Sequence, residues 1–393
     1  MIFILMNYID DDFSTLLQLY YDFIEFNPSI ISNPDFEEIM IDEVFSLLKM
    51  SLNENDDIEE YIMDLIEESL PLFYDFIYPS RQEKNTYCRE VSMEEKIIIN
   101  DKLEKINNIE QPAQKTPEWY DFRNNILTAS NAYKIFESQA QQNSLIYEKC
   151  ITKIHDNNFV NTESSLHWGQ KYEPLSIIIY ENTYKTKIKE YGCLRHDKYL
   201  FLGASPDGIN VDVSSNRFGR LLEVKNIVNR EITGIPKKEY WIQMQLQMET
   251  FNIDECDFLE TKFIEYTDEL EFIRDSDDNI FISKEGEKKG ILLFFLDKNS
   301  GKPIYIYPDI NMSYTDFEVW SHYKIEEILK ENEHYIWVKQ IYWKLNDISC
   351  ILVKRNKKWF QDMIPIISNF WDIIKREKTD GFEHRKPKSR ITI

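Results

Sequence analysis

The stretch Gly203-Ala-Ser-Pro-Asp-Gly208, followed by Leu221-Leu-Glu-Val-Lys225, decides the fold of this chain. Residues 221–225 predict a short apolar strand, and a strand places alternate side chains on the same face. Glu223 and Lys225 therefore point the same way, while the leucine and the valine beside them point into a core. The strand thus presents one carboxylate and one ammonium together.

Asp207 lies in a Pro-Asp-Gly turn that we expect to end a strand over residues 199–204. If that strand pairs with residues 221–225 as a hairpin, with residues 212–220 as the loop, Asp207 comes beside Glu223. Two carboxylates and an ammonium in one small volume are suited to holding a divalent metal beside a phosphate. The structural alternative is an ordinary turn followed by a solvated strand face.

Length and composition allow two or three domains with a large core, since the chain has 393 residues and 42% of them are hydrophobic. The formal net charge is −23, and residues 1–110 carry 26 acids against 7 bases. Such acidity disfavours nucleic-acid binding, but most of it lies in this one segment. Residues 354–393 hold 11 bases and 5 acids, which form either a phosphate-contacting edge or a solvated basic tail.

The cysteines and the first residues bear on the compartment. Neither the five scattered cysteines nor the six histidines show zinc-site spacing, which indicates free thiols in a reducing compartment. Residues 1–6 are too short for a signal peptide, and no apolar run reaches the length of a membrane span. We therefore expect a soluble intracellular protein that does not bind membranes.

The chain divides into three predicted parts. Residues 1–110 show acidic amphipathic helices without evident chemistry, which indicates an accessory or interaction domain; an acidic, DNA-mimicking surface is the alternative. Residues 111–345 form the core, opened by a helix start at Thr116-Pro117-Glu118. Residues 346–393 contribute a strand, a helix and the basic tail.

The periodicity of the second half predicts the following elements: helices over 240–251, 314–333 and 359–377, strands over 257–266, 291–296, 304–307, 335–345 and 350–353, and a charged excursion over 268–289.

Arg123 ends one predicted helix, and Thr128 or Ser130 would cap the next. A guanidinium beside a helix N-terminus suits a phosphate, because both supply oriented donors. The alternative is that Arg123 pairs with a local acid.

Three further groups flank the opening motif. Glu173 precedes Pro174, which disfavours helical geometry at Glu173, and a carboxylate at such a kink is a candidate metal ligand. Asp197 is either a polar turn residue or an outer supporting acid. Gln243 and Gln247 lie one helical turn apart on the face of Tyr240 and could hold a water or a phosphate. Each residue alone is also compatible with an exposed surface.

In this order the motifs resemble the phage lambda exonuclease and YqaJ viral recombinase family of PD-(D/E)xK nucleases. The resemblance covers about residues 116–266 and rests on Trp119…Arg123, Thr128-Ala-Ser130, Trp168-Gly…Tyr172-Glu173, Ser205-Pro-Asp207-Gly, Leu222-Glu223-Val-Lys225 and Tyr240-x-x-Gln243-x-Gln245. It implies an α/β fold, a restriction-endonuclease-like mixed sheet flanked by helices, preceded here by the acidic helical domain.

The resemblance also implies roles for single residues. Glu173, Asp207, Glu223 and the carbonyl of Val224 would bind one or two Mg²⁺ ions, which Mn²⁺ can replace. Lys225 and Gln243 would orient the attacking water, with Asp197 in the place of a supporting acid. Arg123 and Ser130, with Tyr240 nearby, would hold a DNA phosphate at the 5′ end.

The implied activity is a Mg²⁺-dependent DNA exonuclease, 5′→3′ on double-stranded ends, that serves viral or phage recombination or repair in the host cytoplasm or nucleus. A single-strand annealing protein and further copies of the chain are the implied partners. The loop between Asp207 and Glu223 is longer than in the phage member, and large extensions flank the core. An endonuclease or structure-specific nuclease, or a non-catalytic DNA-binding or virion protein on the same fold, therefore remains an alternative.

Overall fold

The computed structural model describes residues 11–51, 58–83, 90–112, 116–151, 161–162 and 164–387. Its longer helices are α2 (Asp11–Phe26), α3 (Phe36–Ser51), α4 (Ile58–Phe76), α5 (Met93–Asn107), α6 (Pro117–Asn124), α8 (Gln139–Cys150), α9 (Ser165–Tyr184), α10 (Lys238–Phe251), α12 (Tyr314–Glu331) and α13 (Lys357–Asp380). Its strands are β1 (Leu127–Thr128), β2 (Ile188–Lys189), β3 (Leu194–Arg195), β4 (Leu202–Ala204), β5 (Gly208–Asn210), β6 (Leu221–Asn226), β7 (Glu255–Glu265), β8 (Lys289–Asp297), β9 (Pro303–Ile306) and β10 (Tyr335–Lys354).

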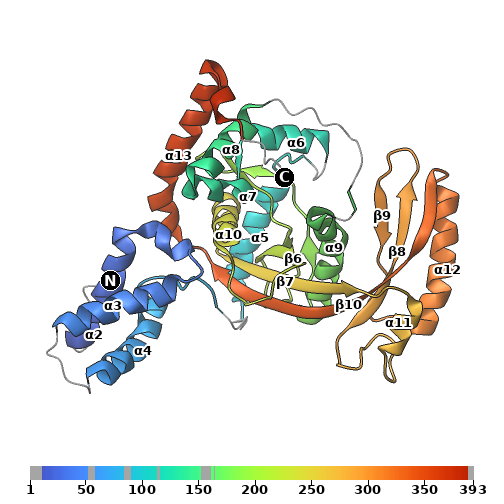
Figure 1. The fold of residues 1–393 in the computed structure, drawn as a ribbon, viewed down its shortest axis with the longest axis horizontal. Coiled ribbons are helices and arrows are strands. Elements are labelled where there is room, and N and C mark those ends of the chain that lie inside the picture. The colour runs from blue at the N-terminus through green and yellow to red at the C-terminus, as the bar shows by residue number, and fades with distance from the viewer. Residues whose placement is uncertain are drawn as a thin grey trace, which may run out of the picture.

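The core is a mixed seven-stranded sheet in the order β2-β5-β6-β7-β10-β8-β9. Strands β6 and β7 are parallel, and the other neighbours are antiparallel. Helix α9 covers one face, where Leu222 and Val224 pack against Tyr180. Helix α10 covers the opposite face at β6, the face of Glu223. The predicted mixed α/β sheet flanked by helices is confirmed (Figure 1).

Strand β10 joins the core to an arm that carries β8, β9, α12 and the short helix α11 (Glu269–Arg274) (Figure 1). It pairs with β7 through one half and with β8 through the other. The prediction of two strands here is wrong, because a β-bulge at Asn346 shifts the register without ending the strand. The charged excursion over 268–289 contains α11.

Helices α2, α3 and α4 pack together through buried aromatic side chains, with the rings of Tyr20 and Phe73 5.3 Å apart. The predicted acidic N-terminal helices are thus confirmed. Arg81 connects them to the core, since its buried guanidinium donates to the carbonyls of Ile31 and Ser32 and to that of Pro236 before α10. Helix α5 lies against the core, where Ile99 contacts Gly219.

The three-part division of the chain stays a prediction. The boundary proposed after residue 345 falls inside the single strand β10. Four cysteines, Cys150, Cys193, Cys256 and Cys350, are free thiols, while Cys88 and residues 1–6 lie outside the described residues. Within the described ranges, no helix combines the length and the apolar character that crossing a bilayer requires.

The hairpin that brings Asp207 to β6 differs from the predicted one. Residues before the turn form β4, which is only three residues long and belongs to a separate small sheet, β1-β4-β3. Strand β5, which follows the turn, pairs with β6, and Gly208 lies opposite Leu222. The turn therefore transfers the chain from one sheet to the other, and Asp207 lies at the point of transfer.

Helix α9 runs without interruption through Pro174, so the predicted departure from helical geometry at Glu173 is wrong. Proline removes one backbone donor, but tertiary packing compensates. Tyr172 and Leu175 on either side are buried in a cluster with Phe263 and Trp343. Glu173 therefore lies on a helix rather than at a break.

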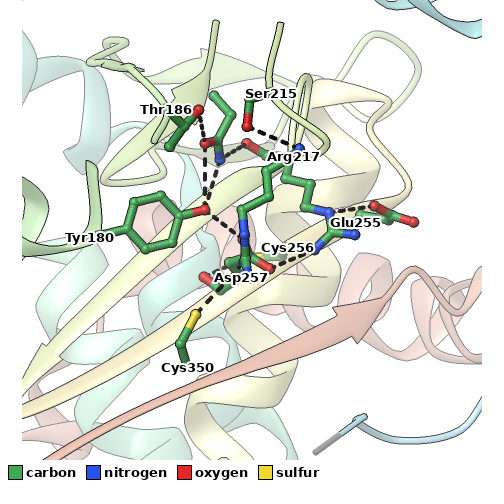
Figure 2. Close-up of polar contacts among 10 residues, drawn as sticks. Tyr180, Thr186, Ser215, Arg217, Glu255, Cys256, Asp257 and Cys350 are labelled. Atoms are coloured by element: carbon green, nitrogen blue, oxygen red, sulfur yellow. Dashed lines mark hydrogen bonds and ion pairs between the residues drawn. The ribbon is translucent and has the colours of Figure 1, made fainter. Parts of the chain in front are cut away.

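The β5–β6 loop is tied to the sheet by a buried ion cluster around Asp257 of β7 (Figure 2). The guanidinium of Arg217 binds its Oδ2, and Nη1 of Arg220 binds its Oδ1 at 3.1 Å. The hydroxyl of Tyr180 on α9 donates to the same carboxylate at 2.5 Å. One carboxylate thus fixes the loop, the sheet and α9 relative to one another.

Candidate active site

Asp207 is held against β6 by two hydrogen bonds. Its backbone N–H donates to the carbonyl of Leu222 at 3.1 Å, and its Oδ2 accepts from the N–H of Val224 at 2.7 Å. The N–H and C=O of a strand residue point to the same side of the strand. The carbonyl of Val224 therefore faces the same edge of β6 as Asp207, as expected of two ligands for one ion.

Glu223 is fully buried, and both of its carboxylate oxygens accept hydrogen bonds. Gln243 donates to Oε1 at 2.7 Å, Gln247 donates to Oε2 at 2.7 Å, and the ammonium of Lys225 pairs with Oε1. The structure thus confirms that Glu223 and Lys225 share a face. The two glutamines face the sheet rather than solvent, which keeps the buried carboxylate satisfied.

Gln247, which helical spacing pairs with Gln243 but to which the resemblance gave no role, is a member of this group. Its Nε2 bonds Glu223, its side chain is fully buried, and its Oε1 is buried without a hydrogen-bond partner. The predicted shared helix face of Gln243 and Gln247 is confirmed, since both side chains donate to the Glu223 carboxylate.

Negative charge is concentrated at Asp207. Burial, together with the carboxylates of Glu223 and Glu173, raises the pKa of Asp207 well above its usual range, and Lys225 with the Val224 N–H offsets only part of this rise. Burial alone would lower the pKa of Lys225, but Glu223 and Asp207 raise it above its ordinary value. Three carboxylates near one ammonium leave an excess of negative charge, which favours a bound cation.

The oxygen donors suit Mg²⁺ in kind, because hard divalent cations prefer carboxylate and carbonyl oxygens. The described residues nevertheless contain no three acidic, histidine or cysteine side chains close enough to form a ready-made metal centre. The carboxylate of Glu173 on α9 contributes to the raised pKa of Asp207. An ion would therefore have to draw these carboxylates closer together.

Arg123 and Ser130 lie side by side, with Nη2 of Arg123 donating to Ser130 Oγ at 3.1 Å. The guanidinium carbon is 4.2 Å from the ring centroid of Trp119, and burial lowers the pKa of Arg123. The prediction of a capped helix here is wrong in part, since α7 (Ala129–Ala132) is a single turn and Thr128 makes no capping bond. The candidate phosphate contact thus depends on side chains.

Two other predicted residues have different positions. The ring centroid of Tyr240 on α10 is 5.0 Å from the ammonium of Lys225, so Tyr240 belongs to the group. Asp197 does not join it: the side chain is exposed in the loop after β3, and its charge acts on His196. Among the described residues, the structure shows no contact between Asp197 and the carboxylate–lysine group that would support the predicted role.

The basic segment over residues 354–358 is paired with acids while its lysine side chains stay 38–63% exposed, so the choice between a solvated tail and a phosphate-contacting edge stays a prediction. Its lysines and its arginine pair with acids: Lys354 with Glu83, Arg355 with Glu249 and Asp254, Lys357 with Asp254, and Lys358 with Glu25 and Asp362. Acids from the N-terminal part thus neutralise part of this segment. Of the basic tail, residues 388–393 lie outside the described residues.

Together, these elements define a mixed α/β core, a sheet flanked by helices that carries the carboxylate–lysine group on β6. Residues 118–254 match the family model of the YqaJ-like viral recombinase domain. This match confirms the predicted resemblance, and the stretch from Arg123 to Gln247 lies within the matched residues.

Known proteins match over longer ranges. An uncharacterised protein of Acanthamoeba polyphaga mimivirus is 32% identical over 324 residues, which is 74% of this chain and 58% of the relative. The chain thus spans less than two thirds of that relative's length. The crystal structure of an alkaline exonuclease from Laribacter hongkongensis matches at 17% identity with a TM-score of 0.39, covering 67% of this chain and 94% of that one. Its complex with dAMP gives a TM-score of 0.38 at the same identity and coverage.

Proposed function

We propose that the chain is a Mg²⁺-dependent deoxyribonuclease that degrades double-stranded DNA from its ends, 5′→3′, in viral recombination or repair. The observation that carries this proposal is the convergence of Asp207, Glu223 and Lys225 beside Glu173 within a YqaJ-like domain. The cluster makes poor sense as a structural ion pair, because it holds more acids than bases.

Glu173, Asp207, Glu223 and the carbonyl of Val224 would hold the ion, and Mn²⁺ is expected to replace it. When bound, it would neutralise phosphate charge and lower the pKa of a bound water. Lys225 and Gln243 orient the attacking water, while Gln247 keeps the Glu223 carboxylate in place. Arg123 and Ser130 bind the terminal phosphate, as forked donors do.

The decisive experiment compares linear with circular duplex DNA, labelled at the 5′ or the 3′ end, in Mg²⁺ and in EDTA. The proposal expects linear DNA to disappear in Mg²⁺ from the 5′ end while circles remain intact. Nicked circles would identify an endonuclease instead. Binding to both substrates without cleavage would identify a non-catalytic DNA-binding protein.

Arg123→Ala is expected to lower kcat/KM on 5′-phosphorylated ends by about 10–100-fold, because a hydrogen bond to a charged group contributes about 1.5–3 kcal/mol. Ends with a 5′-hydroxyl should be affected much less. Cleavage rates on 5′-phosphorylated and 5′-hydroxyl ends are measured in parallel for the parent and the variant. The ratio of the two losses tests the role of Arg123.

Arg195→Ala is the matched control for Arg123→Ala. Arg195 on β3 is exposed, and its guanidinium carbon is 4.8 Å from the ring centroid of Phe122, which lies on the same helix as Arg123. It should lower both rates equally, as the loss of one surface charge does. An equal loss on both ends with Arg123→Ala would remove its assigned role.

A further inference from the structure

Helix α9 lies on the sheet through one stripe of residues that includes Glu173. Gly169, Glu173 and Ser176 are spaced i, i+4 and i+7, so they share a helix face. Gly169 and Ser176 both contact β6, at one residue, Asn226. Glu173 lies between these two points of attachment.

Asn226 uses both ends of its amide to make this attachment. Its Nδ2 donates to the carbonyl of Gly169 at 3.2 Å. Its Oδ1 accepts from the hydroxyl of Ser176 at 2.7 Å and from that of Thr261 on β7 at 2.8 Å. The two hydroxyls are also 2.8 Å from each other, and both side chains are fully buried. The amide therefore joins two turns of α9 to two strands.

The position of Asn226 in β6 makes this attachment relevant to the carboxylates. Asn226 directly follows Lys225 and points to the opposite face of the strand, the face that α9 covers. Asp207 is bonded to the N–H of Val224 in the same strand, two residues earlier. The separation of Glu173 from Asp207 is therefore set by how α9 is attached to β6.

The helix needs such an attachment at this turn. Pro174 has no backbone N–H, so α9 lacks one internal hydrogen bond next to Glu173. A Cβ added to Gly169 would meet no atom within 4 Å, so no side-chain packing holds the helix at that point. The amide of Asn226 supplies polar contacts on both sides of the weakened turn.

We propose that Asn226 is a positioning residue, which holds α9 so that Glu173 stands within reach of the ion bound by Asp207 and Glu223. This inference rests on the proposed function. Asn226 touches neither the ion nor DNA, and its effect is on the affinity of the site for the metal. Residues that orient metal ligands commonly change metal affinity by about 10–100-fold when replaced.

The test measures the binding of Mn²⁺ to Asn226→Ala without DNA. Calorimetry or the electron paramagnetic resonance signal of free Mn²⁺ gives the dissociation constant. We expect the dissociation constant to rise by about 10–100-fold. The Mg²⁺ concentration for half-maximal cleavage should rise by a similar factor, while the rate at saturating Mg²⁺ stays near that of the parent. This separation of metal affinity from maximal rate is not expected of a residue that only supports the fold.

Asn356→Ala is the matched control, because Asn356 is also a buried asparagine that orders a helix: its Oδ1 accepts from the N–H of Trp359 at the start of α13. It should lower the melting temperature without changing Mn²⁺ affinity. Ser176→Ala provides a milder second variant if Asn226→Ala does not fold, since Thr261 still bonds Asn226. Its affinity should shift in the same direction by a smaller factor.

The outcomes distinguish the inference from the proposed function. If the parent protein binds Mn²⁺ and cleaves DNA but Asn226→Ala, or Ser176→Ala in its place, binds Mn²⁺ as the parent does, the positioning role alone is refuted. If the parent neither binds the ion nor cleaves DNA, the proposed function fails and the positioning role fails with it. Weaker metal binding with the control unchanged supports the inference.

Discussion

Asp207→Asn is expected to lower the rate of DNA cleavage by at least about 10²–10³-fold, the usual loss when one group that stabilises the transition state is removed. Asparagine has the shape of aspartate, and its Oδ1 can still accept the N–H that Val224 donates at 2.7 Å. What disappears is one negative charge among three. The metal-free variant should therefore fold as the parent does and be more stable, because the repulsion by Glu223 and Glu173 is relieved.

The pH dependence of stability gives a second readout of the same substitution. A carboxyl whose pKa is raised in the folded state binds its proton more tightly there than in the unfolded chain, so ionisation of Asp207 destabilises the fold. Its contribution is most favourable below the ordinary pKa of about 4 and is lost as pH rises towards the raised value. The stability advantage of Asp207→Asn should thus grow with pH in melting curves recorded in EDTA.

Mg²⁺ completes this test, since an ion that binds only the folded state raises the melting temperature. The parent should gain stability on addition of Mg²⁺, and Asp207→Asn should gain much less. Asp372→Asn, a surface aspartate that pairs with Lys375 on α13, should match the parent in every measurement. Cleavage by Asp207→Asn at the parent rate would refute the role of this carboxylate.

The local features of the site could be predicted from sequence. Alternation along β6 places Glu223 and Lys225 on one face, and helical spacing brings Gln243 and Gln247 to the same carboxylate. Such features depend on periods of two and 3.6 residues, which the sequence displays directly. The strand and helix near these residues, β7 and α10, were predicted for the same reason.

The non-local features could not be predicted. The choice between β4 and β5 as the partner of β6 depends on which sheet each strand joins, and both strands are only three residues long. The helix through Pro174 depends on packing against strands far along the chain. Lys358 forms an ion pair with Glu25, which lies more than three hundred residues earlier in the chain. No sequence periodicity predicts such a pair.

Asp257→Ala is expected to lower the free energy of unfolding by about 3–5 kcal/mol, as removal of one partner from a buried ion pair commonly does. Asp257 is fully buried, and the two arginines that bind it are 3% and 2% exposed. Arg220 would keep its bond to Glu255 at 2.6 Å, but Arg217 would lose its bond to Asp257 in a site closed to water. Denaturant unfolding of the metal-free protein measures the loss.

Asp254→Ala separates burial from ion pairing as the cause of this loss. Asp254 also pairs with several bases, Lys102, Arg355 and Lys357, at 3.4–3.6 Å, but its side chain is 54% exposed. Water replaces a lost partner at such a site, so the expected cost is only about 0–1 kcal/mol. Equal costs for the two substitutions would show that the buried cluster does not hold the β5–β6 loop on the sheet. A large cost for Asp257→Ala alone, with cleavage near the parent rate wherever the variant remains folded, would assign the cluster to the fold and leave the chemistry to Asp207, Glu223 and Lys225.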